Sequence, residues 1–337
     1  MMYFLIGVMI RLFVKIMTTN KISFIYIMVH NTIKYRNGGK NYTKKIRNIN
    51  CNPAMKNKLK SRPTCMNAKM IKLIRDEYNK NHDDKIVEKK SAKIWDALRD
   101  KLKSCNREDC WLQEIENEQL KETFMESAFS PFHPNEWKKN PSTWLTNYDI
   151  LNVLSQYEKA YKQFDFIGPT PIDFDEQPQT YNDVCVWKEL CKFNLQKMID
   201  KGIKKIGVIF NLDKHTGPGT HWTSLFIDVQ DKFIFYFDSA GDSIPSEVNK
   251  LVEKVIHQGL ELDNHIKFQY YDTNNYSHQR GNNECGMYSL FMIITMLTNR
   301  VDNKIFKHSK EKLDFFIEQR IPDTQVFKKR KIYFNKE

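Results

Sequence analysis

The chain has 337 residues, of which 41% are hydrophobic and 13% aromatic. This composition supplies a substantial core for one large domain or for a main domain with an accessory region, which excludes a wholly disordered chain. The net charge of +12 comes from the N-terminal part: residues 1–75 contain 16 Lys and Arg and no Asp or Glu, which leaves a net −4 on residues 76–337.

Residues 1–65 form a predicted basic, flexible N-terminal segment. Its apolar run over residues 3–10 is shorter than the about 20 residues of a membrane span and lacks the flanks of a signal peptide, so we expect no stable membrane insertion. Met28 is a plausible alternative start. Residues 34–62 carry ten Lys and Arg without a hydrophobic period. Such a segment is either a solvated tail or an arm that contacts nucleic acid by counterion release.

Residues 66–130 are predicted to form a helical accessory module. Apolar residues recur there at intervals of three and four, which is typical of amphipathic helices: Met70, Leu73, Ile74, Ile86, Ile94, Trp95, Leu98 and Leu102. Three prolines then interrupt the pattern and mark a boundary: Pro131, Pro134 and Pro141. We expect a second domain over residues 131–315 and a charged, helical C-terminal extension over 316–337.

The pattern over residues 131–315 indicates a compact domain of mixed helices and strands. A helix with Asn147 as its N-cap continues to Tyr161, and a Gly/Pro-rich loop is expected over 214–220. The remaining predicted elements, in chain order, are a buried strand over 205–212, a hairpin of strands over 222–229 and 232–238, a helix over 245–260, a strand over 265–271 and a buried helix over 286–297.

The seven cysteines are an odd number, in a chain too long to need a disulfide framework. This predicts free thiols and a reducing compartment. The pairs Cys105 with Cys110 and Cys185 with Cys191 lack the spacing of zinc ligands, and no second pair of Cys or His follows them. We therefore expect buried structural cysteines at these positions, with no metal and no cofactor.

Three residues with the chemistry of a hydrolase occur in order: His221, Asp238 and Cys285. His221 begins one strand of the predicted hairpin and Asp238 ends its partner, so both are expected at the same end of the strand pair. Cys285 stands at the start of the apolar helix, and Gln279 precedes it by six residues. A base, an orienting carboxylate, a thiol and an amide donor are the components of a cysteine hydrolase.

The proposed roles follow from what a thiol nucleophile requires. A thiol with a pKa near 8.5 is only about 3% ionised at neutral pH, so His221 and the helix N-terminus must activate Cys285 against the charge of Glu284. The Gln279 amide and the Cys285 backbone N–H would stabilise an oxyanion. Singly, each residue has an ordinary explanation, namely a surface His, a turn-forming Asp or a core Cys. The order with Cys last excludes the papain order, in which Cys comes first.

These residues resemble the adenain-type cysteine proteases, which include the SUMO-specific proteases and the polyprotein-processing proteases of large DNA viruses. Residues 140–310 carry the resemblance, through Gly219-Thr220-His221-Trp222, Phe237-Asp238-Ser239 and Gln279 with Glu284-Cys285-Gly286. It implies a papain-like α+β fold, in which a central mixed sheet packs on a buried helix that carries the catalytic cysteine. It also implies His221 as base, Asp238 as orienting residue, Cys285 as nucleophile and Gln279 as oxyanion donor.

Trp144 and Trp222 match the tryptophans that, in the SUMO proteases, close over a narrow channel for Gly-Gly. A groove covered by indoles admits residues without a Cβ, although ordinary aromatic core remains the alternative for both. Trp144-Leu145-Thr146-Asn147 resembles the family's Trp-Leu-Asn-Asp segment, but Tyr148 stands where a final Asp is expected. Ser239-Ala240-Gly241 also departs from the cellular proteases and is closer to the viral ones.

The sequence therefore predicts a thiol protease that cleaves viral structural polyproteins after Gly-Gly-like sites during virion maturation. Its expected partner is a protein substrate, and its expected location is the virion and the host cytoplasm. Two alternatives stay open. The first is an isopeptidase that removes SUMO or ubiquitin-like modifiers, and the second is a non-catalytic module that binds nucleoprotein through the basic segment.

Overall fold

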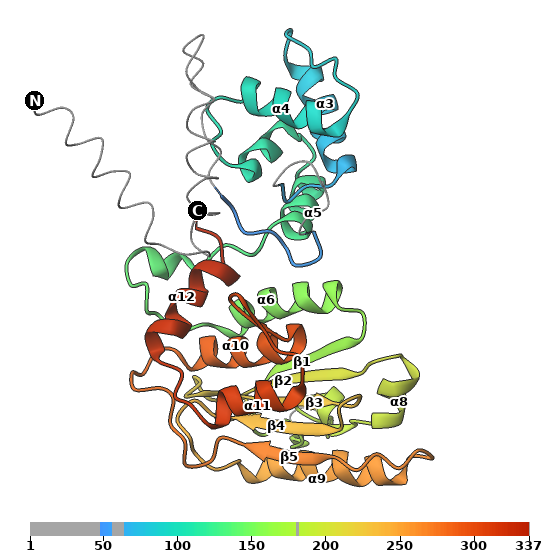
Figure 1. Cartoon of the computed structure of the whole chain (residues 1–337), viewed down its shortest axis with the longest axis vertical. Coiled ribbons are helices and arrows are strands. Elements are labelled where there is room, and N and C mark those ends of the chain that lie inside the picture. Colours follow the sequence, from blue (N-terminus) through green and yellow to red (C-terminus); the bar gives the residue numbers. More distant parts are fainter. Residues whose placement is uncertain (1–47, 56–63, 180–181, 337) are drawn as a thin grey trace, which may run out of the picture. The chain divides into compact units, whose positions relative to one another are not determined.

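The computed structural model describes residues 48–55, 64–179 and 182–336 (Figure 1). A five-stranded mixed sheet has the order β1-β2-β3-β4-β5. β2, β3 and β4 pair antiparallel in succession, while β1 runs parallel to β2 and β5 runs parallel to β4. The strands are β1 Phe164–Pro171, β2 Lys205–Asn211, β3 Trp222–Asp228, β4 Phe233–Phe237 and β5 Gln269–Asp272, with a separate short pair β6 Arg300–Val301 and β7 Lys304–Ile305.

Helices cover both faces of this sheet (Figure 1). α6 (Asn147–Ala160) and α10 (Cys285–Thr298) contribute to the apolar cluster on one face, and α8 (Leu195–Asp200) and α9 (Ser246–Glu261) contribute to the cluster on the other. Alternate strand residues enter the two clusters, so every residue of β3 is buried and its sequence does not alternate with polar residues. The expected α+β fold with a central mixed sheet is confirmed.

α10 is the buried helix that the sequence predicts. All its residues from Cys285 to Leu297 are buried, because the sheet lies along one side and other helices pack around the rest. α11 Ser309–Ile317 and α12 Asp323–Tyr333 pack against α10 on the same side of the sheet, and a 3-10 segment η2 Asn135–Lys138 precedes α6. The short helix α7 Lys188–Cys191 contributes Leu190 to the cluster on the other face.

The residues between 64 and 130 build an apolar cluster of their own. The periodic pattern from Met70 to Leu102 belongs to two helices, and Asn67 caps the first by accepting a hydrogen bond from the Met70 backbone N–H at 3.0 Å. The helical structure is interrupted at residues 82–90, where the Ile86 side chain is nevertheless buried. The elements are α3 Ala68–Asn81, α4 Ser91–Lys101, η1 Glu108–Glu114 and α5 Glu118–Ala128.

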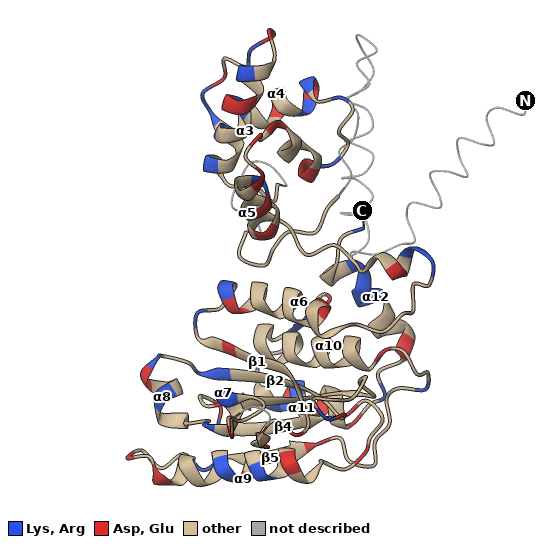
Figure 2. Cartoon of the chain, turned by 180° about the vertical axis from the view of Figure 1, so that it is seen from behind, with Lys and Arg blue, Asp and Glu red and all other residues tan. Residues whose placement is uncertain are grey.

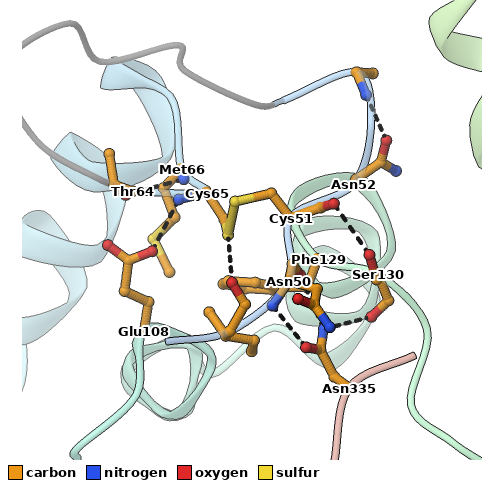
Figure 3. Close-up of a disulfide and its surroundings, with 12 residues drawn as sticks. Asn50, Cys51, Asn52, Thr64, Cys65, Met66, Glu108, Phe129, Ser130 and Asn335 are labelled. Carbon is orange, nitrogen blue, oxygen red and sulfur yellow. Dashed lines mark hydrogen bonds between the residues drawn. A yellow bond between two sulfur atoms is a disulfide. The ribbon is translucent and has the colours of Figure 1, made fainter. Parts of the chain in front are cut away.

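The described residues around Cys51 connect this N-terminal part with the end of the chain (Figure 3). Cys51 is joined to Cys65 by a disulfide. The neighbouring Asn50 exchanges two hydrogen bonds with Asn335: its backbone N–H donates to Asn335 Oδ1 at 2.7 Å, and Asn335 Nδ2 donates to its carbonyl at 2.9 Å. Asn335 Nδ2 also donates to the Ser130 carbonyl at 2.9 Å. One side chain therefore holds three segments that are far apart in the sequence.

The expectation of free thiols is wrong for six of the seven cysteines. Besides Cys51–Cys65, the structure pairs Cys105 with Cys110 and Cys185 with Cys191, and Cys285 alone is free. The cysteines of the latter two pairs are separated by five and six positions in the sequence, and their Cα atoms lie 5.6 and 6.3 Å apart, within the range that a disulfide bridges. The argument for a reducing compartment loses this support.

Two other expectations need correction. The N-cap of α6 is Thr146, not Asn147, because Thr146 Oγ1 accepts from the Asp149 backbone N–H and the Asp149 carboxylate accepts from the Thr146 backbone N–H. β1 was absent from the predicted elements, because Gly168, Pro169 and Pro171 interrupt its apolar pattern. It pairs with β2 at the edge of the sheet, where proline is tolerated.

Most of the basic segment over 1–65 lies outside the described residues, and its contact with nucleic acid stays a prediction. Along the described helices, acidic and basic residues are interspersed, for example on α4 and α9 (Figure 2). Within the described ranges, no helix combines the length and apolarity that crossing a membrane requires. The same residues contain no cluster of three or more His, Cys, Asp or Glu side chains placed to hold a metal ion.

Candidate active site

The β3–β4 hairpin brings His221 and Asp238 together. His221 directly precedes β3 and Asp238 directly follows β4, and the antiparallel register pairs Ser224 with Phe237. Both residues therefore leave the sheet at the same end, as the sequence predicts. His221 Nε2 lies 2.7 Å from Asp238 Oδ1, which is the distance of a strong, charge-assisted hydrogen bond.

The Asp238 carboxylate is fully buried and is held by the surrounding backbone. Its Oδ1 also accepts a hydrogen bond from the Ala240 N–H at 2.8 Å. The backbone of Asp238 exchanges two further hydrogen bonds of 3.0 Å with the Thr273 hydroxyl. A carboxylate fixed in this way sets both the tautomer and the direction of the imidazole that it contacts.

His221 faces Cys285 as well as Asp238. Burial disfavours the charged imidazole, but the hydrogen bonds with Asp238 and with Cys285 outweigh this effect and raise the pKa of His221 from 6.5 to about 10. Because Nε2 is occupied by Asp238, Nδ1 is the ring nitrogen left to face the sulfur. The imidazole is therefore protonated at neutral pH, a state that stabilises a neighbouring thiolate and can donate a proton.

Cys285 is the first residue of α10, and the fold explains why a glycine follows it. A Cβ on Gly286 would lie 3.2 Å from both Trp222 Cδ1 and Leu145 Cβ, closer than side chains normally pack. Glycine thus allows the start of α10 to approach the Trp222 indole. Cys285 itself lies at a helix N-terminus, where backbone N–H groups are unpaired and the positive end of the helix dipole is found.

Gln279 lies next to the residue that follows Asp238. Its Oε1 accepts a hydrogen bond from the Ser239 hydroxyl at 2.9 Å, and its backbone N–H donates to the Ser239 carbonyl at 2.8 Å. Its side-chain amide donates one hydrogen bond to the Gly281 carbonyl at 2.6 Å. An amide carries two N–H donors, so one remains for a ligand.

Trp144 and Trp222 line one cavity of about 690 Å³. Trp222 is buried, and its indole N–H donates to the Leu145 carbonyl at 3.2 Å. Trp144 is 41% exposed, and its indole N–H donates to Asn283 Oδ1 at 3.1 Å. Each indole is thus held by a hydrogen bond, and both contribute to the cavity wall, although Trp222 is also part of the apolar core.

A model of the Ulp1 protease family, C-terminal catalytic domain, matches residues 117–321, which contain all of these residues. The chain belongs to this family of cysteine proteases. The cysteine protease of African swine fever virus (isolate Tick/Malawi/Lil 20-1/1983) is 33% identical over 198 residues, 57% of this chain and 68% of that protein. The crystal structure of the protease from the same virus has a TM-score of 0.55 at 25% identity and covers 75% of this chain and 94% of its own.

A candidate thiol protease of Acanthamoeba polyphaga mimivirus is 32% identical over 176 residues, which is 52% of this chain. The chain spans about half of that relative, since the match covers 55% of its length. The similarity to viral members of the Ulp1 family agrees with the sequence departures after Asp238, which favour the viral proteases.

Two residues at the site of this Ulp1-family chain were not foreseen: Arg330 and Asp323. Arg330 Nε and Nη2 donate to the two oxygens of Glu284, each at 3.0 Å, so the carboxylate beside Cys285 is neutralised by its partner. Asp323 accepts backbone hydrogen bonds from residues just after Gln279. Both lie on α12, more than 40 residues away in the sequence, where no local pattern reveals the contact.

Two histidines that the sequence offers besides His221 have other roles. His278 is fully buried, and its Nδ1 accepts a hydrogen bond from the Ile321 N–H at 3.1 Å. His215 Nδ1 lies 2.7 Å from Asp173 Oδ2, and its side chain lines the wall of the Trp144 cavity. Neither is paired with Cys285 in the way that His221 is.

Proposed function

We propose that this chain is a thiol protease that cleaves after Gly-Gly-like sites, with His221, Asp238 and Cys285 as its catalytic triad and Gln279 as oxyanion donor. The observation that carries the proposal is the His221 imidazole, which is bonded to the buried Asp238 at 2.7 Å and faces Cys285 at the start of α10. Membership of the Ulp1 family supports the same chemistry.

In the proposed mechanism each residue has a defined role. His221 holds the proton of the Cys285 thiol, and the resulting thiolate attacks the carbonyl carbon of the scissile bond. The electrons of the carbonyl move onto its oxygen, which the Gln279 amide and the Cys285 N–H stabilise. As the C–N bond breaks, His221 gives its proton to the leaving amine. Water, deprotonated by His221, then hydrolyses the thioester and restores the thiol.

Selectivity for glycine is supported by the surroundings of the nucleophile. Cys285 is only 2% exposed, and the adjoining cavity is lined by Trp144 and Trp222. Cys285 itself does not line this cavity, but Trp222 directly follows His221 and lies against Gly286, so a peptide bound in the cavity would reach the sulfur past the Trp222 indole. Residues without a Cβ need the least width, so glycine is favoured on the N-terminal side of the scissile bond.

The surface at the mouth of this cavity suits a protein substrate. Trp144, Tyr148 and Leu151 are 41%, 71% and 42% exposed and follow one another at intervals of four and three on and just before α6. Such an exposed apolar stripe beside a cleft is typical of a binding surface. We infer that the substrates are viral structural polyproteins, cleaved in the virion and host cytoplasm; the stripe supports a protein substrate, and the viral origin of the relatives supports a viral setting.

One observation favours a second candidate, a SUMO isopeptidase. Relatives from other isolates of African swine fever virus carry the name SUMO-1 cysteine protease at 32% identity. Both candidates use one site and one chemistry, so only the substrate distinguishes them.

The test compares the two substrate classes directly. We would incubate the wild-type chain and Cys285→Ala with a virion protein precursor that contains Gly-Gly-X sites and, separately, with a SUMO conjugate. The proposal expects cleavage of the precursor after Gly-Gly by the wild type alone. Cleavage of the conjugate alone would favour the isopeptidase, and cleavage by Cys285→Ala would refute the assigned nucleophile. A thiol-directed probe that labels neither Cys285 nor any other residue would favour a non-catalytic binding module.

A further inference from the structure

α12 lies outside the residues that the family model matches, yet it contacts the loop that connects Gln279 with Cys285. We call residues 279–284 the oxyanion loop. Half of this loop is exposed, namely residues 280–282, and none of it is in a helix or strand. The shape of the loop must therefore come from hydrogen bonds with other segments. α12 supplies such hydrogen bonds at both the start and the end of the loop.

The N-terminal end of α12 holds the start of the oxyanion loop. Asp323, the first residue of the helix, accepts hydrogen bonds from the Gly281 N–H at 2.8 Å and from the Arg280 N–H at 3.1 Å. The Tyr288 hydroxyl on α10 lies 2.8 Å from its other oxygen. Hydrogen bonds to an ionised carboxylate are stronger than neutral ones, and a carboxylate is favoured at a helix N-terminus.

Gly281 connects Asp323 with Gln279, the predicted oxyanion donor, through two hydrogen bonds. The N–H of Gly281 is bound by Asp323, and the carbonyl of Gly281 accepts from Gln279 Nε2 at 2.6 Å. The Ser239 hydroxyl donates to Oε1 of Gln279, the other polar atom of the same amide group. Asp323 therefore sets the position of the residue against which the Gln279 amide is oriented.

The other end of the oxyanion loop is held by Arg330, seven residues further along α12 and hence on the same helix face as Asp323. Its guanidinium donates to both oxygens of Glu284 and, at 3.3 Å, to the Asn283 carbonyl. These residues immediately precede Cys285. One face of α12 thus binds the loop beside its oxyanion donor and beside its nucleophile.

We propose that α12 is a positioning element for the active site, with Asp323 as the positioning residue that orients the Gln279 amide and Arg330 as the one that fixes the chain before Cys285. This rests on the proposed roles of Gln279 and Cys285. Asp323 touches neither substrate nor reacting atoms. It acts through the Gly281 peptide group, so its loss impairs oxyanion stabilisation while the thiol and its base stay in place.

The test compares Asp323→Asn, which keeps the volume of a partly exposed side chain, with Lys329→Met. Lys329 is a buried residue of the same helix whose ion pair with Asp302 at 2.7 Å is remote from the oxyanion loop, so it is the matched control. Three quantities would be measured for each: kcat and KM on a Gly-Gly-X peptide, inhibition by the corresponding peptide aldehyde, and the rate of Cys285 alkylation by iodoacetamide. Melting temperatures report on folding.

The aldehyde distinguishes the oxyanion from the nucleophile. The sulfur of Cys285 adds to its carbonyl carbon, and the carbonyl electrons move onto the oxygen, which either stays anionic or takes the His221 proton. Alkylation instead displaces iodide and creates no oxyanion. Removing one oxyanion donor costs about 10²–10³-fold in kcat, so for a displaced donor we expect a loss of about tenfold or more.

Asp323→Asn is therefore expected to lower kcat and aldehyde affinity by about tenfold or more, with KM and the alkylation rate within about twofold of wild type. Lys329→Met should leave all three close to wild type. Unchanged kcat in Asp323→Asn, or an equal fall in cleavage and alkylation, would overturn the inference. A wild-type chain that neither cleaves the peptide nor reacts with iodoacetamide would overturn the proposed function, and this inference with it.

Discussion

The buried ion pair between Glu284 and Arg330 gives a quantitative test of how the chain before Cys285 is held. Their side chains are 8% and 4% exposed, and the guanidinium also donates to the Thr143 carbonyl at 2.9 Å and lies 4.2 Å from the Trp137 ring centroid. Replacing Arg330 with Met removes both hydrogen bonds to the carboxylate and leaves Glu284 as a buried charge without its partner. Breaking a buried pair in this way costs about 3–5 kcal/mol of unfolding free energy.

A double variant separates the unpaired charge from lost packing. Adding Glu284→Gln to Arg330→Met removes the buried carboxylate as well, and should recover more than half of the lost free energy, because the cost of the single variant comes mainly from the uncompensated buried charge. Urea unfolding followed by tryptophan fluorescence measures each value. A loss below about 1 kcal/mol in the single variant, or a double variant as unstable as the single one, would refute the reasoning.

The stability of Arg330→Met should also depend on pH, in a direction that the pKa of Glu284 determines. Burial raises the pKa of Glu284 above its usual 4.5, and the hydrogen bonds and charge of Arg330 oppose this rise. Without Arg330 the folded-state pKa is higher still, so the carboxyl binds a proton more readily in the folded chain than in the unfolded one. Its protonation then favours folding. The deficit of Arg330→Met should shrink as pH falls from 7 towards 4.5, and a deficit that grows would contradict this account.

Three further predictions follow from the site and its surroundings. Asp238→Asn should lower kcat by about 10²–10⁴-fold and also lower the melting temperature, because it removes the buried partner of the His221 imidazole. Asp228→Asn, which changes a buried carboxylate at the opposite end of β3, should leave kcat near wild type once folded; a loss of kcat below threefold in Asp238→Asn would contradict the orienting role. Without reductant, mass spectrometry should find iodoacetamide on Cys285 but on none of the six paired cysteines, and labelling of those six would show that the pairs do not form. Burial lowers the pKa of His278 from 6.5 to about 4, so protons bind the unfolded chain preferentially in this window and the unfolding free energy should fall by up to about 3 kcal/mol as pH drops from 6.5 to 4; an equal slope in His278→Gln would exclude this residue as the cause.

The sequence predicts those parts of the site that depend on local geometry. In a hairpin, the start of the first strand and the end of the second lie at the same end of the strand pair. The sequence therefore predicts that His221 and Asp238 lie close together. An apolar stretch without polar positions indicates a buried helix, which placed Cys285 at its start. Both inferences use only periodicity and chain direction, and these properties are visible in a short window of sequence.

Contacts that depend on the tertiary fold could not be predicted in this way. α12 has the charged composition of a surface helix, yet Arg330 is buried because Glu284, 46 residues earlier, approaches it through folding alone. The cysteine pairs could not be predicted for a related reason. Neither the odd number of cysteines nor the length of the chain indicates which turns bring two sulfur atoms together. β1 could not be predicted because Gly168 and Pro169 interrupt its apolar pattern. A proline is tolerated there because β1 lies at the edge of the sheet.

The central claim, that Cys285 attacks the bond after a glycine pair, is tested most directly with a library of Gly-Gly-X peptides. Wild-type chain and Cys285→Ala would be incubated with the library and with a matched set in which Ala-Ala replaces Gly-Gly, and the products would be identified by mass spectrometry. The account predicts cleavage after the second glycine by the wild type, little cleavage of the Ala-Ala set and none by Cys285→Ala. Cleavage of both sets at equal rates would contradict the glycine channel, and products formed by Cys285→Ala would contradict the nucleophile.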